Sequence, residues 1–202
     1  MKKGLSLLEL IIAISLLGIA TLAFFSLHLF GTNQQSSSTK LTILQNEASH
    51  ALEHMTKQIQ KATGNILETG TDAPIRAYTD NRGIIIRIRE VTPPDKWIAY
   101  RHEGSTINFY DNTTNTPGII PAADTGSIIA RRVKVTDLTQ PSNLWGLSFR
   151  IPVDNNNLGV NIITCWYPDE VCPGNVTCLC GSSDNPQVIM NTNIKMPSVS
   201  SN

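Results

Sequence analysis

A predominantly apolar run over residues 10–30 constrains this chain more than any other feature, and Glu9 stands immediately before it. Within the run only Ser15, Thr21, Ser26 and His28 are polar. As an α-helix the run is long enough to cross the hydrocarbon core of a bilayer, which takes about 20 residues. Lys2 and Lys3 precede the run, and no charged residue follows it before Lys40. Because cytoplasmic flanks carry an excess of Lys and Arg, we expect Met1 in the cytoplasm and the chain after residue 30 outside it.

The length and charge of the chain exclude some functions. Its 202 residues suit one domain with a real core. Lys plus Arg and Asp plus Glu both number 16, so the formal net charge is zero. The chain has no basic excess that would indicate nucleic acid as a partner. It has no acidic excess that would indicate a cationic partner either.

Two ordinary explanations of the apolar run each fail to account for one feature of the sequence. A secretory signal peptide has an apolar stretch of about 7–15 residues and a small-residue cleavage site. This run is longer, and no A-x-A site follows it. A plain membrane anchor accounts for the length and the lysines but leaves Glu9 unexplained. A carboxylate at the centre of a membrane span costs roughly 2.5–3.5 kcal/mol, so it usually has a function and a partner.

The start of the chain resembles the type IV prepilin signal. Residues 1–4 form a short basic leader that ends in Gly4, and a hydrophobic residue, three further residues and Glu9 come next. The resemblance implies that a prepilin peptidase cuts between Gly4 and Leu5 and N-methylates Leu5. Phe is commoner at the new N-terminus in that family, so Leu5 departs from the usual pattern.

The resemblance also implies an assembly role for Glu9. Cleavage leaves a cationic amine four residues before Glu9, and in a stack of subunits the amine of one can pair with Glu9 of its neighbour. In a low-dielectric filament core an unpaired carboxylate is costly and a paired one is tolerable. We therefore expect Glu9 to set the register in which subunits add.

A second helical pattern follows the apolar run. After the polar stretch 31–39, apolar residues recur every three or four positions, which is the stripe of an amphipathic helix. We expect one helix from about Leu5 to Thr63, ending before Gly64 and Asn65. The members of the stripe are Leu41, Leu44, Ala48, Leu52, Met55, Ile59 and Ala62.

The same helix contains a possible metallopeptidase pattern. His50, Glu53 and His54 fit H-x-x-E-H, and His residues four positions apart on a helix can share a zinc ion. The sequence offers no clear third ligand and no second active-site helix. We therefore interpret the pattern as a solvated helix face and expect no catalytic residue, no metal and no cofactor.

Beyond residue 65 the sequence predicts strands, because Pro, Gly, Asn and Asp separate short β-rich runs. One long helix followed by these runs predicts an α+β fold, in which the helix packs on an antiparallel sheet. We expect a hairpin turn at residues 102–105. The seven predicted strands are 83–91, 97–101, 107–110, 128–135, 147–153, 158–167 and 188–196.

Four cysteines lie within residues 165–180. An extracytoplasmic location favours disulfides. A bridge between the near neighbours Cys178 and Cys180 is strained, which leaves two pairings open. One is Cys165–Cys178 with Cys172–Cys180, and the other is Cys165–Cys180 with Cys172–Cys178. A zinc knot is the rival interpretation, but its usual paired C-x₂₋₄-C spacing is absent.

The strand region resembles J-type pseudopilins and W-type minor pilins at residues 97–101, 147–150 and 191–194. Major subunits of the family usually carry a Pro in the apolar helix, and this chain has none before Pro74, so the resemblance favours a minor subunit. The expected organisation is a leader (1–4), a transmembrane and polymerisation helix (5–30), its amphipathic continuation (31–64) and an extracytoplasmic β-rich domain (65–202).

The resemblance implies a minor pilin or pseudopilin of a type IV pilus or a type II secretion pseudopilus. Such a subunit would lie in the inner membrane as a single-pass protein and then in the filament. The implied partners are prepilin peptidase, other minor pilins or pseudopilins, the major pilin, the inner-membrane assembly platform and, before assembly, membrane lipid. The alternative is a membrane-anchored extracytoplasmic binding module that does not polymerise.

Overall fold

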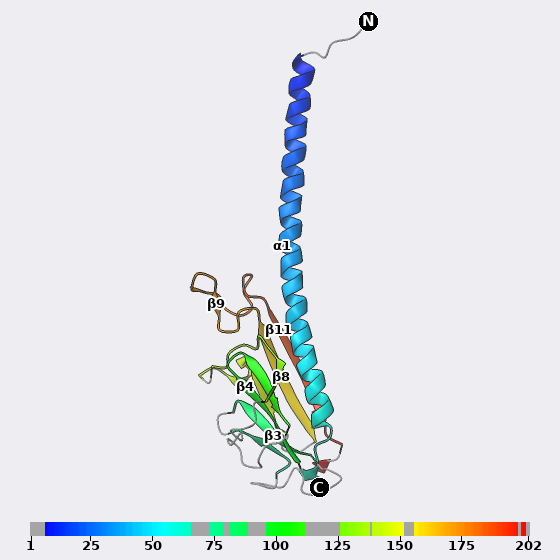
Figure 1. Ribbon diagram of the computed structural model, residues 1–202, viewed down its shortest axis with the longest axis vertical. Helices are drawn as coiled ribbons and strands as arrows, with labels where there is room; N and C mark the ends of the chain where they lie inside the picture. Colours follow the sequence, from blue (N-terminus) through cyan, green and yellow to red (C-terminus); the bar gives the residue numbers. More distant parts are fainter. Residues whose placement is uncertain are drawn as a thin grey trace. The chain divides into compact units, whose positions relative to one another are not determined.

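One long helix and several antiparallel strands make up the computed structural model, which describes residues 7–65, 73–78, 81–88, 96–111, 126–137, 139–151, 156–197 and 199–200. Helix α1 (Leu7–Ile59) comes first, and the strands follow it (Figure 1). The chain divides into two compact units, Met1–Lys40 and Leu41–Asn202. The α+β class predicted from the sequence is confirmed.

The first unit is helical throughout its described part. Helix α1 continues through Gly18, Gly31 and the polar stretch 31–39 without interruption. In that polar stretch the hydroxyl of Thr32 donates to the Leu29 carbonyl at 3.0 Å, and the hydroxyl of Thr39 donates to the Gln35 carbonyl at 2.8 Å. These side chains therefore bond to the helix itself without breaking its ladder.

In the second unit, α1 buries one stripe of its surface. The stripe differs from the predicted one at two positions: Leu41 is exposed, and Ala51 takes the central place expected for Leu52, which lies half-buried at the edge. The small side chain of Ala51 allows the helix to approach the strands closely there. The fully buried residues of the stripe are Leu44, Ala48, Ala51, Met55, Ile59 and Ala62.

Helix α1 also ends earlier than predicted, at Ile59 instead of Thr63. The backbone N–H of Ala62 bonds to the Ile59 carbonyl at 3.0 Å, so the chain tightens into a three-residue turn. Gly64 then adopts a φ of +136°, which a residue with a side chain rarely does.

The larger sheet has five antiparallel strands in the order β2-β3-β4-β5-β6. Strands β4 and β5 form a hairpin whose turn is only Gly104 and Ser105, so His102 and Glu103 belong to the strand and not to the predicted turn. The strands are β2 (Ile75–Ala77), β3 (Gly83–Ile88), β4 (Lys96–Glu103), β5 (Thr106–Tyr110) and β6 (Ser127–Ala130).

A second antiparallel sheet has the order β11-β8-β7, with β7 (Leu147–Arg150), β8 (Asn157–Cys165) and β11 (Gln187–Lys195). A 3-10 turn, η2 (Ser142–Leu144), precedes β7. Two minor pairs complete the β-structure: β9 (Val171–Cys172) with β10 (Val176–Thr177), and the parallel pair of β1 (Gly64–Asn65) with β12 (Val199–Ser200).

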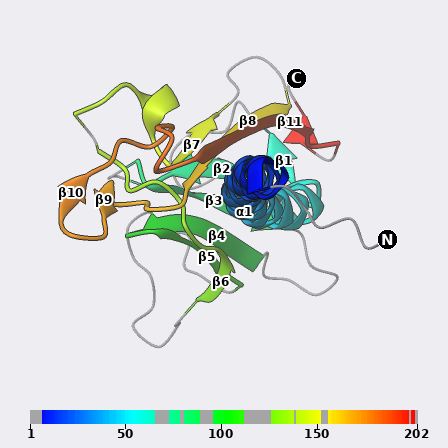
Figure 2. The same cartoon turned by 90° about the horizontal axis from the view of Figure 1, so that it is seen from above.

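The core of the second unit lies where the striped part of α1 meets both sheets, and Figure 2 shows the sheets on different sides of the helix. Polar contacts also tie the helix to both sheets. The hydroxyl of Thr164 in β8 donates to the Leu44 carbonyl at 3.2 Å, and Nδ1 of His54 lies 3.1 Å from the Tyr100 hydroxyl in β4. The helix therefore joins two sheets that share no strand.

All seven predicted strands are present, although their ends differ. The prediction of 128–135 is too long, because Arg132 takes a φ of +55° and the chain leaves the sheet after Ala130. Strands 83–91 and 147–153 were predicted to end within segments that lie outside the described residues. The two- and three-residue strands β1, β2, β9, β10 and β12 were not predicted.

Candidate functional site

The first candidate site is the apolar half of α1, which we define as residues 7–30. Every described side chain from residue 7 to residue 39 is exposed, and the large apolar ones in this half range from 48% exposed at Leu29 to 76% at Leu7. By length and composition this helix can cross a membrane. Large apolar side chains that are exposed in this way are normally covered by lipid or by another protein.

The hydroxyl groups within the apolar half already have partners. Ser15 donates to the Ile11 carbonyl at 2.8 Å, and Thr21 donates to the Leu17 and Gly18 carbonyls at 3.0 and 2.9 Å. In hydrocarbon an unsatisfied polar group has a free-energy cost of roughly several kcal/mol, and these hydrogen bonds avoid that cost. These hydroxyl groups therefore do not prevent the apolar half from lying in lipid.

Of the predicted processing and assembly residues, only Glu9 is described; Gly4 and Leu5 lie outside the described residues. Glu9 is in the first turn of α1 and is exposed. A carboxylate is stabilised there, because the unpaired backbone N–H groups of a helix start carry partial positive charge. The position also leaves the carboxylate accessible to a cationic group of another chain.

The residues of the H-x-x-E-H pattern point to three separate partners. Nδ1 of His50 lies 3.0 Å from the Ile129 carbonyl oxygen, whereas the carboxylate of Glu53 accepts from Lys57 at 2.6 Å. His54 packs edge-on against the Phe109 ring, with 4.7 Å between ring centroids. In the part of the chain that the structure describes, no group of three His, Cys, Asp or Glu side chains is arranged to hold a metal ion.

These contacts also shift proton affinities. Partial burial is the main cause that lowers the pKa of His54, and the nearby His50 adds to it. The hydrogen bond from Lys57 lowers the pKa of the Glu53 carboxyl. At neutral pH His54 is therefore uncharged and acts as a packing residue between α1 and the five-stranded sheet, which the sequence pattern did not indicate.

The four cysteines form two disulfides, Cys165–Cys180 and Cys172–Cys178. This is one of the two pairings left open by the sequence, and it excludes both the other pairing and the zinc knot. Cys165 ends strand β8, so the Cys165–Cys180 bridge fastens the loop of residues 165–180 to the three-stranded sheet. We call this segment the disulfide loop.

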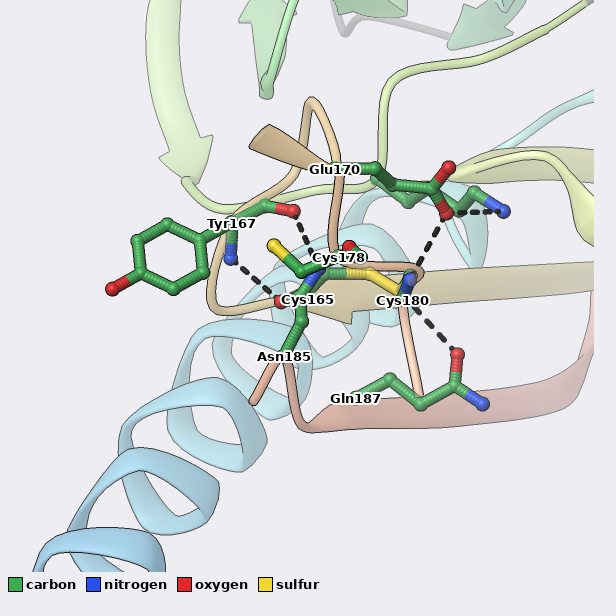
Figure 3. Close-up of polar contacts among 8 residues, drawn as sticks. Cys165, Tyr167, Glu170, Cys178, Cys180, Asn185 and Gln187 are labelled. Atoms are coloured by element: carbon green, nitrogen blue, oxygen red, sulfur yellow. Dashed lines mark hydrogen bonds and ion pairs between the residues drawn. A yellow bond between two sulfur atoms is a disulfide. The ribbon is translucent and has the colours of Figure 1, made fainter. Parts of the chain in front are cut away.

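A buried amide organises this disulfide loop, as Figure 3 shows. Asn185 is fully buried; its Oδ1 accepts from the Tyr167 N–H at 2.8 Å, and its Nδ2 donates to the carbonyls of Tyr167 and Cys178 at 2.9 and 3.0 Å. The Glu170 carboxylate accepts from the Cys180 N–H at 3.0 Å and pairs with Lys134 at 3.3 Å. Neither role has a signal in the sequence, since the partners are backbone groups or, for Lys134, a side chain far away in the sequence.

The disulfide loop presents apolar side chains on a fixed frame. Val171, Val176 and Leu179 are 45%, 61% and 64% exposed. Two bridges and the Asn185 hydrogen bonds hold the backbone that carries them. Neither a protein-family model nor a curated protein nor a solved structure matches this chain, so its own residues carry every functional argument.

Proposed function

We propose that this chain is a prepilin-like subunit, a minor pilin or minor pseudopilin, that polymerises through the apolar half of α1. One observation carries the proposal: the unit from residue 41 onward has its own buried core, whereas every described side chain of residues 7–39 is exposed. Such a helix needs lipid first and helices of other subunits afterwards. Both environments are available to a subunit that moves from a membrane into a filament.

The position of Glu9 distinguishes this proposal from plain anchoring. An anchor gains nothing from a carboxylate at the membrane boundary, where it must be hydrated or paired. A subunit trimmed after Gly4 has a new amine close to Glu9, and two stacked subunits can then pair amine and carboxylate. That pairing is productive only at one axial offset, so it selects the register of addition.

Under this proposal the chain has no catalytic task. It is a substrate of prepilin peptidase and a partner of other minor pilins or pseudopilins, the major subunit and the inner-membrane assembly platform. Its globular unit, which is large beside the helix, suits the start or the cap of a filament, where one end need not stack on another subunit.

The experiment is the mass of the N-terminal peptide after co-expression of the full chain with a prepilin peptidase. We expect a chain that begins at N-methylated Leu5. A Gly4→Val variant should retain Met1, because the side chain blocks the cleavage site. Gly18→Val is the matched control and should be processed normally, since a Cβ at Gly18 meets nothing within 4 Å.

A native chain that still begins at Met1 would contradict the proposal and favour the membrane-anchored binding module. A chain cut elsewhere, after residue 30, would indicate a secreted protein with a cleaved signal. The three outcomes differ in mass, so a single spectrum separates them.

A further inference from the structure

The outer face of the three-stranded sheet carries a groove of about 560 Å³. Strand register shows which side chains point outward, away from the core. In one row Ser148, Asn161 and Asn191 lie side by side across the three strands. In the next row Arg150 and Asn193 flank Gly159. We call this the outer groove.

The polar side chains of the outer groove can form hydrogen bonds with a ligand. Among the residues that the structure describes, none of these amide, hydroxyl and guanidinium groups is hydrogen-bonded or ion-paired to another residue. An Asn amide offers donors and an acceptor side by side, and a vicinal diol requires both. Three amides lie within two adjacent rows, at Asn161, Asn191 and Asn193.

Gly159 forms the floor of the groove. A Cβ placed there would lie 3.1 Å from the Arg150 Cβ and 3.3 Å from the Asn193 amide oxygen, so a side chain would fill the space between them. The hollow exists because this position carries no side chain. Ile189, which is 52% exposed, supplies an apolar surface at the other end of the groove.

The charge of this face selects one sign of ligand. Arg150 lines the groove, Lys195 lies one outward position beyond Asn193 on β11, and none of the described residues that line the groove is acidic. A guanidinium binds a carboxylate through two parallel hydrogen bonds. The absence of carboxylates disfavours metal cations as occupants.

The size of the groove limits what enters. Three strands span roughly 10 Å and two outward positions roughly 7 Å at ordinary sheet spacings, which admits one or two hexose rings. A protein partner is disfavoured, because interface centres use exposed aromatic and apolar anchors, and of the large apolar residues that line the groove Phe149 and Val160 are turned toward the core while Ile189 is 52% exposed.

We propose that the outer groove binds a saccharide whose ring bears a carboxylate, such as a uronic or sialic acid residue. Arg150 pairs with the carboxylate, Asn161, Asn191 and Asn193 bond to the hydroxyl groups, and Ile189 contacts the C–H face of the ring. The site lies wholly within the second unit, so it does not depend on whether the chain polymerises.

The test is saturation-transfer difference NMR on the full chain in detergent micelles, with digalacturonic acid and N-acetylneuraminic acid as probes and cellobiose as the neutral comparison. We expect saturation transfer to the acidic sugars, with weak affinity because the groove is open. Arg150→Gln should weaken binding by about tenfold or more, since a bond to a charged group is lost. Gly159→Ala should weaken it as well.

The matched control is Arg131→Gln, which removes an exposed guanidinium that follows β6 in the other sheet. Its affinity should equal that of the native chain, and near-ultraviolet circular dichroism should show all three variants folded. No saturation transfer to either acidic sugar would overturn the proposal. The proposal would also be overturned if cellobiose bound equally well, or if Arg150→Gln and Arg131→Gln lost the same amount of affinity. Displacement of the sugar by a short peptide with a free carboxylate would overturn it too.

Discussion

The two units of this chain use apolar residues in opposite ways. In the first unit, every large apolar side chain of residues 7–30 is exposed, although this is the most apolar segment of the sequence. In the second unit, the less apolar part of the same helix buries the residues of its stripe from Leu44 to Ile59, with Leu52 half-buried at the edge. Hydrophobicity alone therefore does not decide burial: in the second unit the stripe of α1 packs against the two sheets, whereas the described side chains of the first unit are exposed or half-buried.

The difference makes the first unit an incomplete structure and the second a complete one. Substitutions in the second should change its own folding stability, whereas substitutions in the first should change only interactions with lipid or other chains. All three Trp residues lie in the second unit, at 97, 145 and 166, so Trp fluorescence of the full chain in detergent reports on that unit alone.

The largest expected effect is the loss of a side chain from the buried stripe. Met55 is fully buried within the core cluster, and Met55→Ala should lower the free energy of unfolding by about 2–5 kcal/mol. The measurement is a urea titration followed by Trp fluorescence. Leu16→Ala is the control, since Leu16 is 63% exposed, and it should leave the midpoint unchanged. A similar shift in both variants would remove the distinction between the units.

The second expected effect is a loss of stability in acid, centred on a buried histidine. His102 is 2% exposed, its Nδ1 lies 2.6 Å from the Thr136 hydroxyl oxygen, and burial, followed by repulsion from Arg82, lowers its pKa to about 4. An unfolded His has a pKa of about 6.5, so between these values the unfolded chain binds more protons. This contribution is fully present above pH ~6.5 and is lost as the pH falls toward ~4, by about 3 kcal/mol.

The check compares urea midpoints from pH 7 to pH 4 in the native chain and in His102→Gln. The variant is expected to be less stable at pH 7 but to lose less stability on acidification, because the glutamine does not titrate. Carboxylates contribute equally to both curves. Parallel curves would show that His102 is not the group responsible.

A smaller and more local effect is expected from the disulfide loop. Asn185→Ala leaves the Tyr167 N–H and the carbonyls of Tyr167 and Cys178 without their partner, which costs about 1–3 kcal/mol. Since the disulfides remain, amide hydrogen exchange at Tyr167 should accelerate while strand β8 stays protected. Asp184→Ala, an exposed neighbour, is the control and should exchange like the native chain.

The sequence was sufficient for features that depend on local pattern. The apolar run, the helical stripe and the seven longer strands follow from periodicities of 3.6 and 2 residues, and the structure contains all of them. The disulfides were narrowed to two pairings by the short spacing between Cys178 and Cys180. Sequence separation alone could not choose between those pairings, because the choice depends on how the loop folds back on β8.

Features that depend on pairing between distant segments were not predictable. The split into two sheets, the parallel pair of Gly64 with Val199 and the clamp at Asn185 each join segments whose local sequences carry no sign of the partner. The outer groove is of this kind too. Asn161, Asn191 and Ser148 become neighbours only through strand register, and a shift of one residue would turn them inward.

The smallest expected effect on folding is that of Glu9→Ala, and this substitution tests the comparison between the two units most directly. Glu9 lies in the first turn of α1, within a stretch in which every described side chain from residue 7 to residue 39 is exposed. Glu9→Ala should therefore leave the urea midpoint of the second unit unchanged, and cleavage after Gly4 should proceed normally. If the proposed function holds, incorporation into filaments should fall sharply, because the amine of the neighbouring subunit would lose the carboxylate with which we propose that it pairs.

Glu53→Ala is the matched control for charge, since it removes a carboxylate from the same helix beyond the apolar half. It should assemble like the native chain. If Glu9→Ala also assembled normally, Glu9 would not set the register, and the exposed apolar surface alone would drive association. If it failed to assemble and the second unit were destabilised as well, the two units would be energetically coupled, and the division drawn between them would be wrong.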